Sequence, residues 1–360
     1  MNEKMKGLIL SGGKGTRMRP LTHTSAKQLI PVANKPVLFY GIEAIVNAGI
    51  EEIAIIVSPE TGGEIRKAVG DGSAFGAKIA YIEQDAPRGL AHAVLIAEPF
   101  IKDSPFVMYL GDNLLQHGIT PLVEEYKSIH ANSEILLTRV PNPSQFGVAE
   151  LASDGSVFRL TEKPKEPKSD LALVGVYMFD RHIFDAVKAI KPSFRNELEI
   201  TDAIQWLIDQ KLSVHPHVVK GWWKDTGKIE DMLEANRTVL DTFEMDVRGH
   251  ADAHSQIEGK VIVEEGAEII DSVVRGPVII GKGTRVVHAF VGPYTSIGPG
   301  CAIERCEIEN SIVLESSTIK EVDGRIEASL IGKNVKIGRT QRKPAAYRFM
   351  VGDNSEVGIP

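Results

Sequence analysis

The segment "LILSGGKGTRMRP", residues 8–20, places glycines and cations directly after an apolar run. A tight turn needs one or two glycines, but three glycines followed by Lys14, Arg17 and Arg19 indicate a backbone that approaches a negatively charged group. Lys27 follows in "AKQLIPV" and adds a fourth cation. Backbone N–H groups of such a loop can cradle phosphate oxygens while the cations neutralise their charge. The segment therefore predicts a triphosphate site.

Two familiar phosphate-binding motifs do not fit this loop. The dinucleotide motif G-x-G-x-x-G requires a glycine where Met18 stands after Gly13 and Gly15, and no G-x-x-x-x-G-K-[ST] stretch occurs in the chain. A plain strand-to-helix turn is the alternative interpretation. The cations favour the phosphate interpretation, because a turn alone does not require Arg17 beside its glycines.

The elements around the loop predict a mainly parallel sheet. Apolar runs at 8–10, 53–57 and 79–82 alternate with helical patterns at 36–48 and 89–100, and "FVMYLGDN" at 106–113 continues the order. Such alternation is typical of an α/β domain whose ligands bind beyond the carboxyl ends of the strands. The glycine loop and Asp112 lie at such ends. An isolated aspartate there is otherwise a common cap or turn former, which is the alternative interpretation of Asp112.

Composition limits the class of protein. The chain has 360 residues, 43% of them apolar, which is enough for about two domains with substantial cores. The net charge of −7 argues against a nucleic-acid partner. No apolar run is long enough to span a membrane, and the N-terminus does not resemble a signal peptide, so we expect a cytoplasmic protein without a membrane partner. Cys301 and Cys306 match no metal or disulfide pattern.

The C-terminal part predicts a repeat. From residue 257 β-branched residues recur every five or six positions, and the first members of successive triplets lie 17 residues apart. The triplets are Ile257, Val263, Ile269; Val274, Ile280, Val286; Val291, Ile297, Ile303; Ile308, Leu314, Ile319; and a final irregular Ile326, Ile331, Ile337. "IGKGTR", "VGPYTS" and "IGPGCA" are hexapeptide units of the parallel β-helix kind. We expect a first domain over 1–245, a linker over 246–256, a β-helix over 257–340 and a basic tail over 341–360.

A series of motifs carries a family resemblance. "LSGGKGTRMRPLT", "AKQLIPVANKPV", "QDAPRGLAHAV", "YLGDN", "FGVAEL", "TEKPKEP", "VGVYMFD", "ELEITDAI" and "WWKDTG" follow one another between residues 10 and 227. Their order resembles the sugar-1-phosphate nucleotidylyltransferases, in particular the long-form thymidylyltransferase branch with a C-terminal extension. The resemblance implies an α/β fold: a Rossmann-like mixed sheet in the nucleotidyltransferase domain, followed by a left-handed parallel β-helix.

The resemblance also implies a reaction. The nucleotidyl group of dTTP, or more slowly of UTP, is transferred to glucose 1-phosphate, giving dTDP-glucose and pyrophosphate. The nucleophile is a phosphate oxygen that is largely ionised near neutral pH, because its second pKa is about 6. The reaction therefore needs alignment, charge neutralisation and Mg²⁺ rather than a Ser-His device. Asp112 and Asp225 match the metal carboxylates of the family.

Site residues are carried over from the same motifs. Those implied for the nucleotide are Leu10, Gly12, Gly13, Thr16, Arg17, Gln84, Pro87 and Gly89. Those implied for the sugar are Asn113, Gly147, Glu162, Lys163 and Val174, the last through its backbone. The implied catalytic cations are Arg17 and Lys27 on the nucleotide phosphates and Lys163 on the sugar phosphate.

Several of these segments have a second interpretation. The amide of Gln84 offers a pyrimidine edge both a donor and an acceptor, but Gln84 is equally a candidate for a solvated strand end. The charges of "TEKPKEPKSD" are typical of a solvated loop, and we expect the part after Glu162 and Lys163 to face solvent. Thr201 is predicted to N-cap a helix that begins near Asp202, and is left out of the site. Trp222 and Trp223 are candidates for either pocket or core.

Other functions remain as alternatives: a uridylyltransferase of the UDP-glucose type, a bifunctional nucleotidylyltransferase and acetyltransferase, and a non-catalytic scaffold subunit. Acetyl transfer would need a general base, and His288 is the histidine that the repeat supplies. No acyltransferase motif accompanies it. We expect the β-helix to organise a homo-oligomer, because its coils leave strand edges that a neighbouring subunit can cover.

Overall fold

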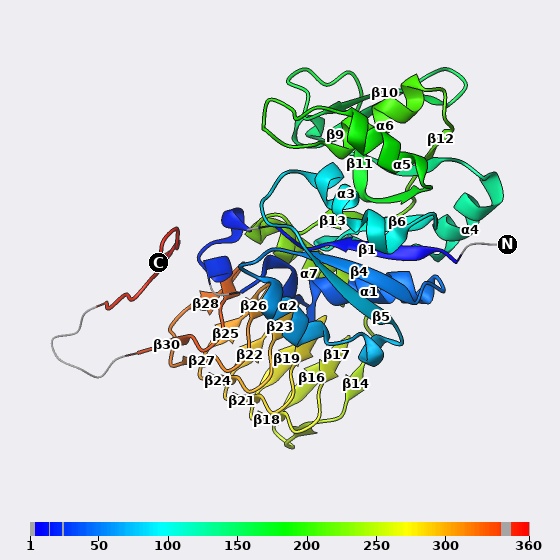
Figure 1. Cartoon of the computed structure of the whole chain (residues 1–360). Coiled ribbons are helices and arrows are strands. Elements are labelled where there is room, and N and C mark those ends of the chain that lie inside the picture. Colours follow the sequence, from blue (N-terminus) through cyan, green and yellow to red (C-terminus); the bar gives the residue numbers. More distant parts are fainter. Residues whose placement is uncertain (1–3, 14, 24, 340–346, 360) are drawn as a thin grey trace. The chain divides into compact units, whose positions relative to one another are not determined.

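The computed structural model describes residues 4–13, 15–23, 25–339 and 347–359 (Figure 1). Lys14 of the glycine loop and residues 340–346, where the basic tail begins, lie outside the described residues. The chain forms two compact units. The first contains the described residues of Met1–Lys14, Ala26–Leu29 and Val37–Asp225, and the second contains those of Gly15–Ser25, Ile30–Pro36 and Thr226–Pro360.

The first unit is built on a mixed sheet of nine strands among the described residues. Its main path runs β10-β9-β11-β6-β1-β4-β5, with β8 beside β11 and β12 beside β8. The strands are β1 (Lys6–Leu10), β4 (Glu52–Val57), β5 (Lys78–Glu83), β6 (Phe106–Leu110), β8 (Ser133–Arg139), β9 (Gly147–Leu151), β10 (Val157–Glu162), β11 (Leu171–Phe179) and β12 (Val214–Val218). The pairs β6-β1, β1-β4 and β4-β5 are parallel, as the alternation of strands and helices predicted.

Helices cover both faces of this sheet because its central strands are apolar on both sides. Leu8 and Leu10 of β1 belong to one buried cluster, and Ile9 between them belongs to another. This alternation is the two-residue period of a strand. The helices are α1 (Val37–Asn47), α2 (Gly62–Val69), α3 (Leu90–Ile101), α4 (Thr120–Ile129), α5 (His182–Ala189) and α6 (Ile200–Asp209). Helices α3, α5 and α6 pack with Leu8, whereas α1, α2 and α4 pack with Ile9.

A small antiparallel pair brings two distant segments of the first unit together. Strand β7 (Asn113–Leu115) directly follows β6 and Asp112, and it pairs with β13 (Trp223–Asp225). The register places Asp225 opposite Asn113. The two predicted metal carboxylates, more than a hundred positions apart in the sequence, thus lie at adjoining positions of one ladder.

The second unit contains three parallel sheets of short strands, consistent with a left-handed β-helix; Figure 1 shows the coils stacked from yellow to orange. One sheet runs β14 (Asp246–Val247), β17 (Val261–Val263), β20 (Val278–Ile280), β23 (Thr295–Ile297), β26 (Ile312–Val313) and β29 (Leu330–Ile331). The second runs β15 (His250–Ala251), β18 (Glu268–Ile270), β21 (Arg285–Val287), β24 (Ala302–Glu304), β27 (Thr318–Lys320) and β30 (Lys336–Gly338). The third runs β16 (Gln256–Glu258), β19 (Val273–Arg275), β22 (Phe290–Val291), β25 (Glu307–Ile308) and β28 (Arg325–Ile326).

The predicted repeat is confirmed in register, with one correction. Ile257 pairs with Val274, and the column continues through the later coils in the same way. In the fourth coil, however, the residue that aligns with Ile297 is Val313 rather than the predicted Leu314. Val313 belongs to the buried cluster of the β-helix. The corner that follows Ile308 is one residue shorter than its predecessors, which the spacing of apolar residues alone could not distinguish.

The expected linker over 246–256 is wrong in part. Strands β14 and β15 already lie within it and pair in parallel with β17 and β18. Their residues are mostly exposed or polar because this first coil ends the stack, and so they lack the apolar pattern of the interior coils.

The boundary between the compact units also differs from the expected residue 245. Helix α7 (Ile229–Leu240) belongs to the second unit and packs on β2 (Pro31–Val32) and on β23. The buried Asn236 explains this assignment: its amide oxygen accepts hydrogen bonds from the Ala33 N–H (2.8 Å) and the Ser296 hydroxyl (2.6 Å). Its amide nitrogen donates to the carbonyl of Tyr294 (3.0 Å). Strand β3 (Lys35–Pro36) closes a hairpin with β2.

Among the described helices, none combines the length and the apolar character required to cross a bilayer. Both cysteines, Cys301 and Cys306, are free and buried inside the β-helix.

Candidate active site

The first unit joins two carboxylates through one buried cation. Lys27, whose side chain is 6% exposed, donates a hydrogen bond to Oδ2 of Asp112. The same ammonium lies 3.9 Å from Oδ1 of Asp225. Burial alone would raise the pKa of Asp112, but the Lys27 ammonium and the Asn113 amide hold this pKa below its ordinary value. Asp112 is therefore a carboxylate at neutral pH, as a metal ligand must be.

Asn113 orients this cluster. Its Nδ2 donates to Oδ1 of Asp112 (2.9 Å), and its Oδ1 accepts from the Gly175 N–H (3.2 Å) and from Nε1 of Trp223 (2.6 Å). Both lone pairs of the amide oxygen are thereby used. Because Asn113 is 2% exposed, its geometry supports positioning of Asp112 rather than the sugar contact that the sequence predicted. Trp223 belongs to this network and is half-buried.

The two carboxylates fit a divalent cation. They converge on one positive group, and Mg²⁺ prefers one or two carboxylates together with phosphate oxygens and water. The donor set is all oxygen, which also suits this ion.

The first half of the glycine loop lies at the carboxyl end of β1. The Ser11 N–H donates to the carbonyl of Ile56 (2.9 Å), which ties the loop to β4. A Cβ at Gly12 would lie 3.4 Å from Oε1 of Gln84, and a Cβ at Gly13 would lie 3.9 Å from Nε2 of Gln28. The predicted residues Gly12 and Gln84 are therefore neighbours, Gly13 lies beside Gln28, and Leu10 leads into the loop from β1.

Gln28 is a residue that the sequence analysis missed. It is 3% exposed, and its Oε1 has no hydrogen-bond partner among the described residues. A buried amide with a free acceptor beside Gly13 is a candidate contact for a ligand donor. Its position next to Lys27 was the available signal.

Thr16 and Arg17 belong to the second unit, where they form a short 3-10 turn, Thr16–Met18. Both are at least partly exposed, whereas Met18, between Arg17 and Arg19, is buried. Gly15 precedes the turn at φ 61°, in the left-handed region that favours glycine. The hydroxyl of Thr22 donates to the Gly15 carbonyl (2.7 Å) and holds this bend.

In the segment predicted to bind the nucleotide base, residues 84–89, the first residue forms a hydrogen bond with the last. Nε2 of Gln84 donates to the Gly89 carbonyl (3.2 Å) and lies 3.0 Å from Nδ1 of His92. Burial, together with the nearby Arg88 charge, lowers the pKa of His92, which favours the neutral ring beside Gln84. Gln84 is thus held by partners rather than free at a strand end. Pro87 lies between Gln84 and Gly89 in this segment.

Gly89 has a strict steric reason to be glycine. Its φ is 100° and ψ 169°, and a Cβ there would lie 2.3 Å from the carbonyl oxygen of Leu198. Leu198 donates its N–H to the Arg88 carbonyl (2.8 Å) and accepts from the Ala91 N–H (3.0 Å). The "ELEITDAI" segment, which the sequence analysis left out of the site, therefore supports the base segment.

The same segment supports the predicted sugar residues, which corrects the interpretation of Thr201. Helix α6 begins at Ile200, with Glu199 at its N-cap position, so Thr201 lies inside the first turn. Its hydroxyl donates to Oε2 of Glu162 (3.3 Å) instead of capping the helix. The N-cap prediction was wrong because the helix begins two residues earlier than expected, with the buried Glu199 at the N-cap position.

Gly147 lies opposite Glu162 in the β9-β10 ladder. A Cβ on Gly147 would lie 2.6 Å from Cγ2 of Thr201 and 3.2 Å from Oε2 of Glu162. Oε1 of Glu162 also lies 3.3 Å from Nζ of Lys163 and 3.6 Å from a guanidinium nitrogen of Arg195. Glycine at 147 thus keeps the Glu162 carboxylate accessible to both cations. Arg195 is a second residue that sequence reasoning missed.

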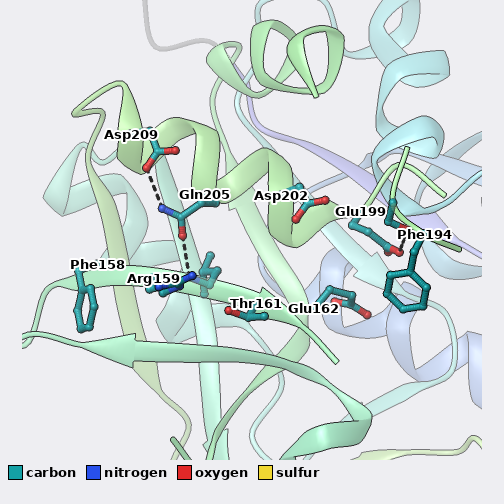
Figure 2. A pocket seen from close by; sticks show the side chains of 11 residues that line it. Phe158, Arg159, Thr161, Glu162, Phe194, Glu199, Asp202, Gln205 and Asp209 are labelled. Atoms are coloured by element: carbon teal, nitrogen blue, oxygen red, sulfur yellow. Dashed lines mark hydrogen bonds between the residues drawn. The ribbon is translucent and has the colours of Figure 1, made fainter. Parts of the chain in front are cut away.

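Glu162 borders a cavity of about 660 Å³ between β10 and α6 (Figure 2). Figure 2 shows Glu199 and Asp202 directed toward the Glu162 end of the cavity, with Phe194 at the same end. Burial raises the pKa of Glu199 and of Asp202, and the Glu162 charge adds to both shifts. The acidic lining can accept hydrogen bonds from hydroxyl groups.

Val174 lies where β11 changes partners. The pairing of β11 with β8 shifts register between Leu173 and Tyr177, and the next residue, Gly175, contacts Asn113. A Cβ at Gly175 would lie 2.6 Å from Oδ1 of Asn113. This irregularity frees the backbone at Val174 from the regular ladder, as a backbone contact with a ligand would require.

His288, the alternative acyl-transfer base, lies at a corner of the β-helix with φ 49°. Its Nδ1 lies 2.7 Å from Oδ2 of Asp271, and both side chains are about half exposed. His288 therefore points outward from its coil.

The fold and the site define a class of protein: an α/β nucleotide-binding unit with a carboxylate pair at its strand ends, joined to a parallel β-helix. Comparison with known proteins agrees. A family model described as nucleotidyl transferase matches residues 6–242. A glucose-1-phosphate thymidylyltransferase from Streptomyces antibioticus is 54% identical over 99% of each chain. A low-salt glycan biosynthesis nucleotidyltransferase from Haloferax volcanii is 49% identical over 99% of this chain and 100% of its own.

Solved structures agree as well. A Bacillus anthracis crystal structure described as a glucose-1-phosphate thymidylyltransferase has a TM-score of 0.63 and 35% identity, and it covers 67% of this chain and 97% of its own. The chain belongs to the nucleotidyl transferase family.

Proposed function

We propose that this chain transfers a thymidylyl group from dTTP to glucose 1-phosphate. An oxygen of the sugar phosphate forms a bond to the α-phosphorus of dTTP, the bond from that phosphorus to the β-phosphate oxygen breaks, and pyrophosphate leaves. The observation that carries the proposal is the convergence of Asp112 and Asp225 on Lys27 at the strand ends. The substrates are suggested by the Streptomyces antibioticus relative.

Asp112 and Asp225 would hold Mg²⁺. When bound, this ion neutralises charge on the reacting phosphates and aligns them. Lys27 keeps the two carboxylates in place and adds a fixed positive charge near the position of the phosphates. Asn113 fixes the rotamer of Asp112. Arg17 is proposed to bind the triphosphate, on the basis of the family motif.

The remaining roles divide between the two substrates. Gln84 and Gly89 would bind the thymine edge, with Leu10, Gly12, Gly13, Thr16 and Pro87 around the nucleotide. Glu162 would accept hydrogen bonds from sugar hydroxyls, and Lys163 would pair with the sugar phosphate. Gly147 and the backbone of Val174 would allow the sugar to approach closely. The contacts of the Gln84 amide with Gly89 and His92 support its role in binding thymine, because a side chain that is already held in place loses little entropy on binding.

We further propose a cytoplasmic homo-oligomer in which the β-helix organises subunits and does not catalyse. Acetyl transfer is not assigned to His288, because no acyltransferase motif accompanies it and its side chain is about half exposed at a corner of the coil. The strand edges of the terminal coils are a physical reason for association.

A pyrophosphate-release assay with a panel of triphosphates and sugar phosphates tests the proposal. We expect the highest kcat/KM for dTTP with glucose 1-phosphate, and slower turnover of UTP, because a single methyl group contributes only about 1–3 kcal/mol of discrimination. Asp112→Asn and Asp225→Asn should each lower kcat at least about a thousandfold. Asp103→Asn, which changes an exposed aspartate, is the matched control and should leave kcat unchanged. A preference for ATP or GTP, or near-native turnover of both active-site variants, would contradict the proposal.

A further inference from the structure

A second cluster of titratable side chains lies in the first unit, on elements that the proposed reaction does not use. Glu125 lies on α4, Glu134 on β8, and His215 and His217 on β12. Strand β12 pairs in parallel with β8, with His215 opposite Glu134. Residues two apart in a strand share a face, so both histidines and Glu134 lie on the same side of this edge.

Helix α4 supplies the carboxylate that connects the histidines. Oε2 of Glu125 lies 2.8 Å from Nδ1 of His217, and its Oε1 lies 3.2 Å from Nε2 of His215. One carboxylate oxygen each of Glu125 and Glu134 and a ring nitrogen of His217 all lie within 4.8 Å of one another. Three ligand atoms of types that bind metals thus converge from three separate elements.

Glu134 gives the second, independent observation. Its side chain is fully buried, and neither of its carboxylate oxygens has a hydrogen-bond partner within the described chain. No lysine or arginine of the described residues forms an ion pair with it. A buried, unpaired carboxylate is costly, and a cation at this position would offset the cost.

We propose that Glu125, Glu134 and His217, with His215 as the fourth ligand, bind a divalent transition metal of the zinc type. Imidazole nitrogen and carboxylate oxygen together suit Zn²⁺, whereas Mg²⁺ prefers oxygen ligands. A tetrahedral zinc site has ligand atoms about 3.4 Å apart. The ligand atoms of Glu125, Glu134 and His217 lie within 4.8 Å of one another, so these three side chains need to close by up to about 1.4 Å around the ion. His215 contacts Glu125 and would have to move toward the other two ligands.

The position of the cluster indicates what the metal would do. Helix α4 follows β7, the strand that begins directly after Asp112, and β12 precedes β13, the strand that ends at Asp225. A metal between α4 and β12 would tie together the two segments that deliver the carboxylate pair. The ion would therefore stabilise the first unit without taking part in the reaction.

Zinc titration of the full-length, tag-free chain tests this assignment. The protein is stripped with a chelator, dialysed, and titrated calorimetrically with ZnCl₂ in excess Mg²⁺, which occupies oxygen-only sites. We expect one zinc per chain, a rise in melting temperature on binding, and the intense visible absorption of tetrahedral Co²⁺ when cobalt replaces zinc. Glu134→Gln and His217→Ala should weaken zinc binding about 10–100-fold.

Control variants show whether zinc binds at this cluster or elsewhere on the chain. Glu124→Gln changes the exposed neighbour on α4 and should leave zinc affinity unchanged. Asp112→Asn should also leave it unchanged, because Asp112 belongs to the other carboxylate cluster. Glu134→Gln keeps the size of the side chain and removes its ionisable group, so the variant is expected to fold, which circular dichroism checks. Glu125→Gln gives a second test.

Absence of stoichiometric zinc binding would overturn the proposal and leave Glu134 as a buried protonated acid. Zinc binding that is lost in Asp112→Asn but kept in Glu134→Gln would overturn it too. Neither result depends on the proposed reaction.

Discussion

Replacement of Gly89 by alanine is expected to damage both stability and nucleotide binding. The added Cβ would lie 2.3 Å from the oxygen and 2.7 Å from the nitrogen of Leu198, so the two segments must separate by about 1 Å to reach an ordinary contact. This separation disrupts the hydrogen bonds of Leu198 with Arg88 and Ala91, which contribute about 1 kcal/mol each. Alanine at φ 100° and ψ 169° adds about 1–3 kcal/mol of backbone strain. The free energy of unfolding should fall by about 3–5 kcal/mol.

Gly70→Ala separates the two contributions. Gly70 also has an unusual backbone conformation, φ 67° and ψ −144°. Apart from its chain neighbours, no atom of the described residues lies within 4 Å of the position that a Cβ would take there, so only the backbone strain applies. Urea unfolding should therefore show a loss about 2 kcal/mol smaller than for Gly89→Ala. The KM for dTTP should rise at least about tenfold in Gly89→Ala, because the Gly89 carbonyl orients Gln84, and should stay unchanged in Gly70→Ala. Equal stability losses in the two variants, or an unchanged KM in Gly89→Ala, would refute the steric explanation.

Three further predictions concern other positions. Asn236→Leu removes the partner of the Ala33 N–H, the Tyr294 carbonyl and the Ser296 hydroxyl, and should lower the free energy of unfolding of the second unit by about 3–5 kcal/mol in urea. Ser296→Ala should lower it by only about 1 kcal/mol. Similar losses in the two variants would contradict this prediction. Thr201→Val removes the hydroxyl bound to Glu162 and should raise the KM for glucose 1-phosphate several-fold at unchanged melting temperature, so a change in KM for dTTP alone would argue against it. Burial raises the pKa of Glu199 above 4.5, so the folded chain binds more protons than the unfolded chain and its free energy of unfolding should fall as the pH rises from 4.5 through the folded-state pKa. Glu199→Gln should flatten this dependence in urea unfolding followed between pH 4.5 and neutrality, and an unchanged slope would contradict the assignment.

Local patterns in the sequence were sufficient for much of the fold. The order of apolar strands and helices predicted the parallel centre of the sheet, and the spacing of 17 residues predicted the stacked coils. Both signals are strong because burial repeats with the period of the backbone, so every turn or strand contributes the same evidence. The residue types also predicted a phosphate and metal site, because cations and glycine backbones bind phosphates and carboxylates bind divalent metals.

Other features depended on contacts between distant residues. A sequence pattern does not show that the Asn113 amide forms hydrogen bonds with Asp112, Gly175 and Trp223. Nor does it show that the Thr201 hydroxyl donates to Glu162. Most of these roles follow from hydrogen-bond partners that are tens of positions away. The boundary between the units was likewise decided by Asn236, a single buried amide in an otherwise ordinary amphipathic helix.

The sequence by itself determined the two kinds of domain and predicted the candidate metal carboxylates and phosphate-binding cations, because hydrophobic periodicity and charge are properties of neighbours along the chain. Only the tertiary structure decided which polar residues support those groups. Glu125, Glu134 and His217 come from separate elements and look like solvated charges in the sequence. They form a cluster because two strands pair and a helix covers them, and burial then removes the water that would otherwise satisfy Glu134.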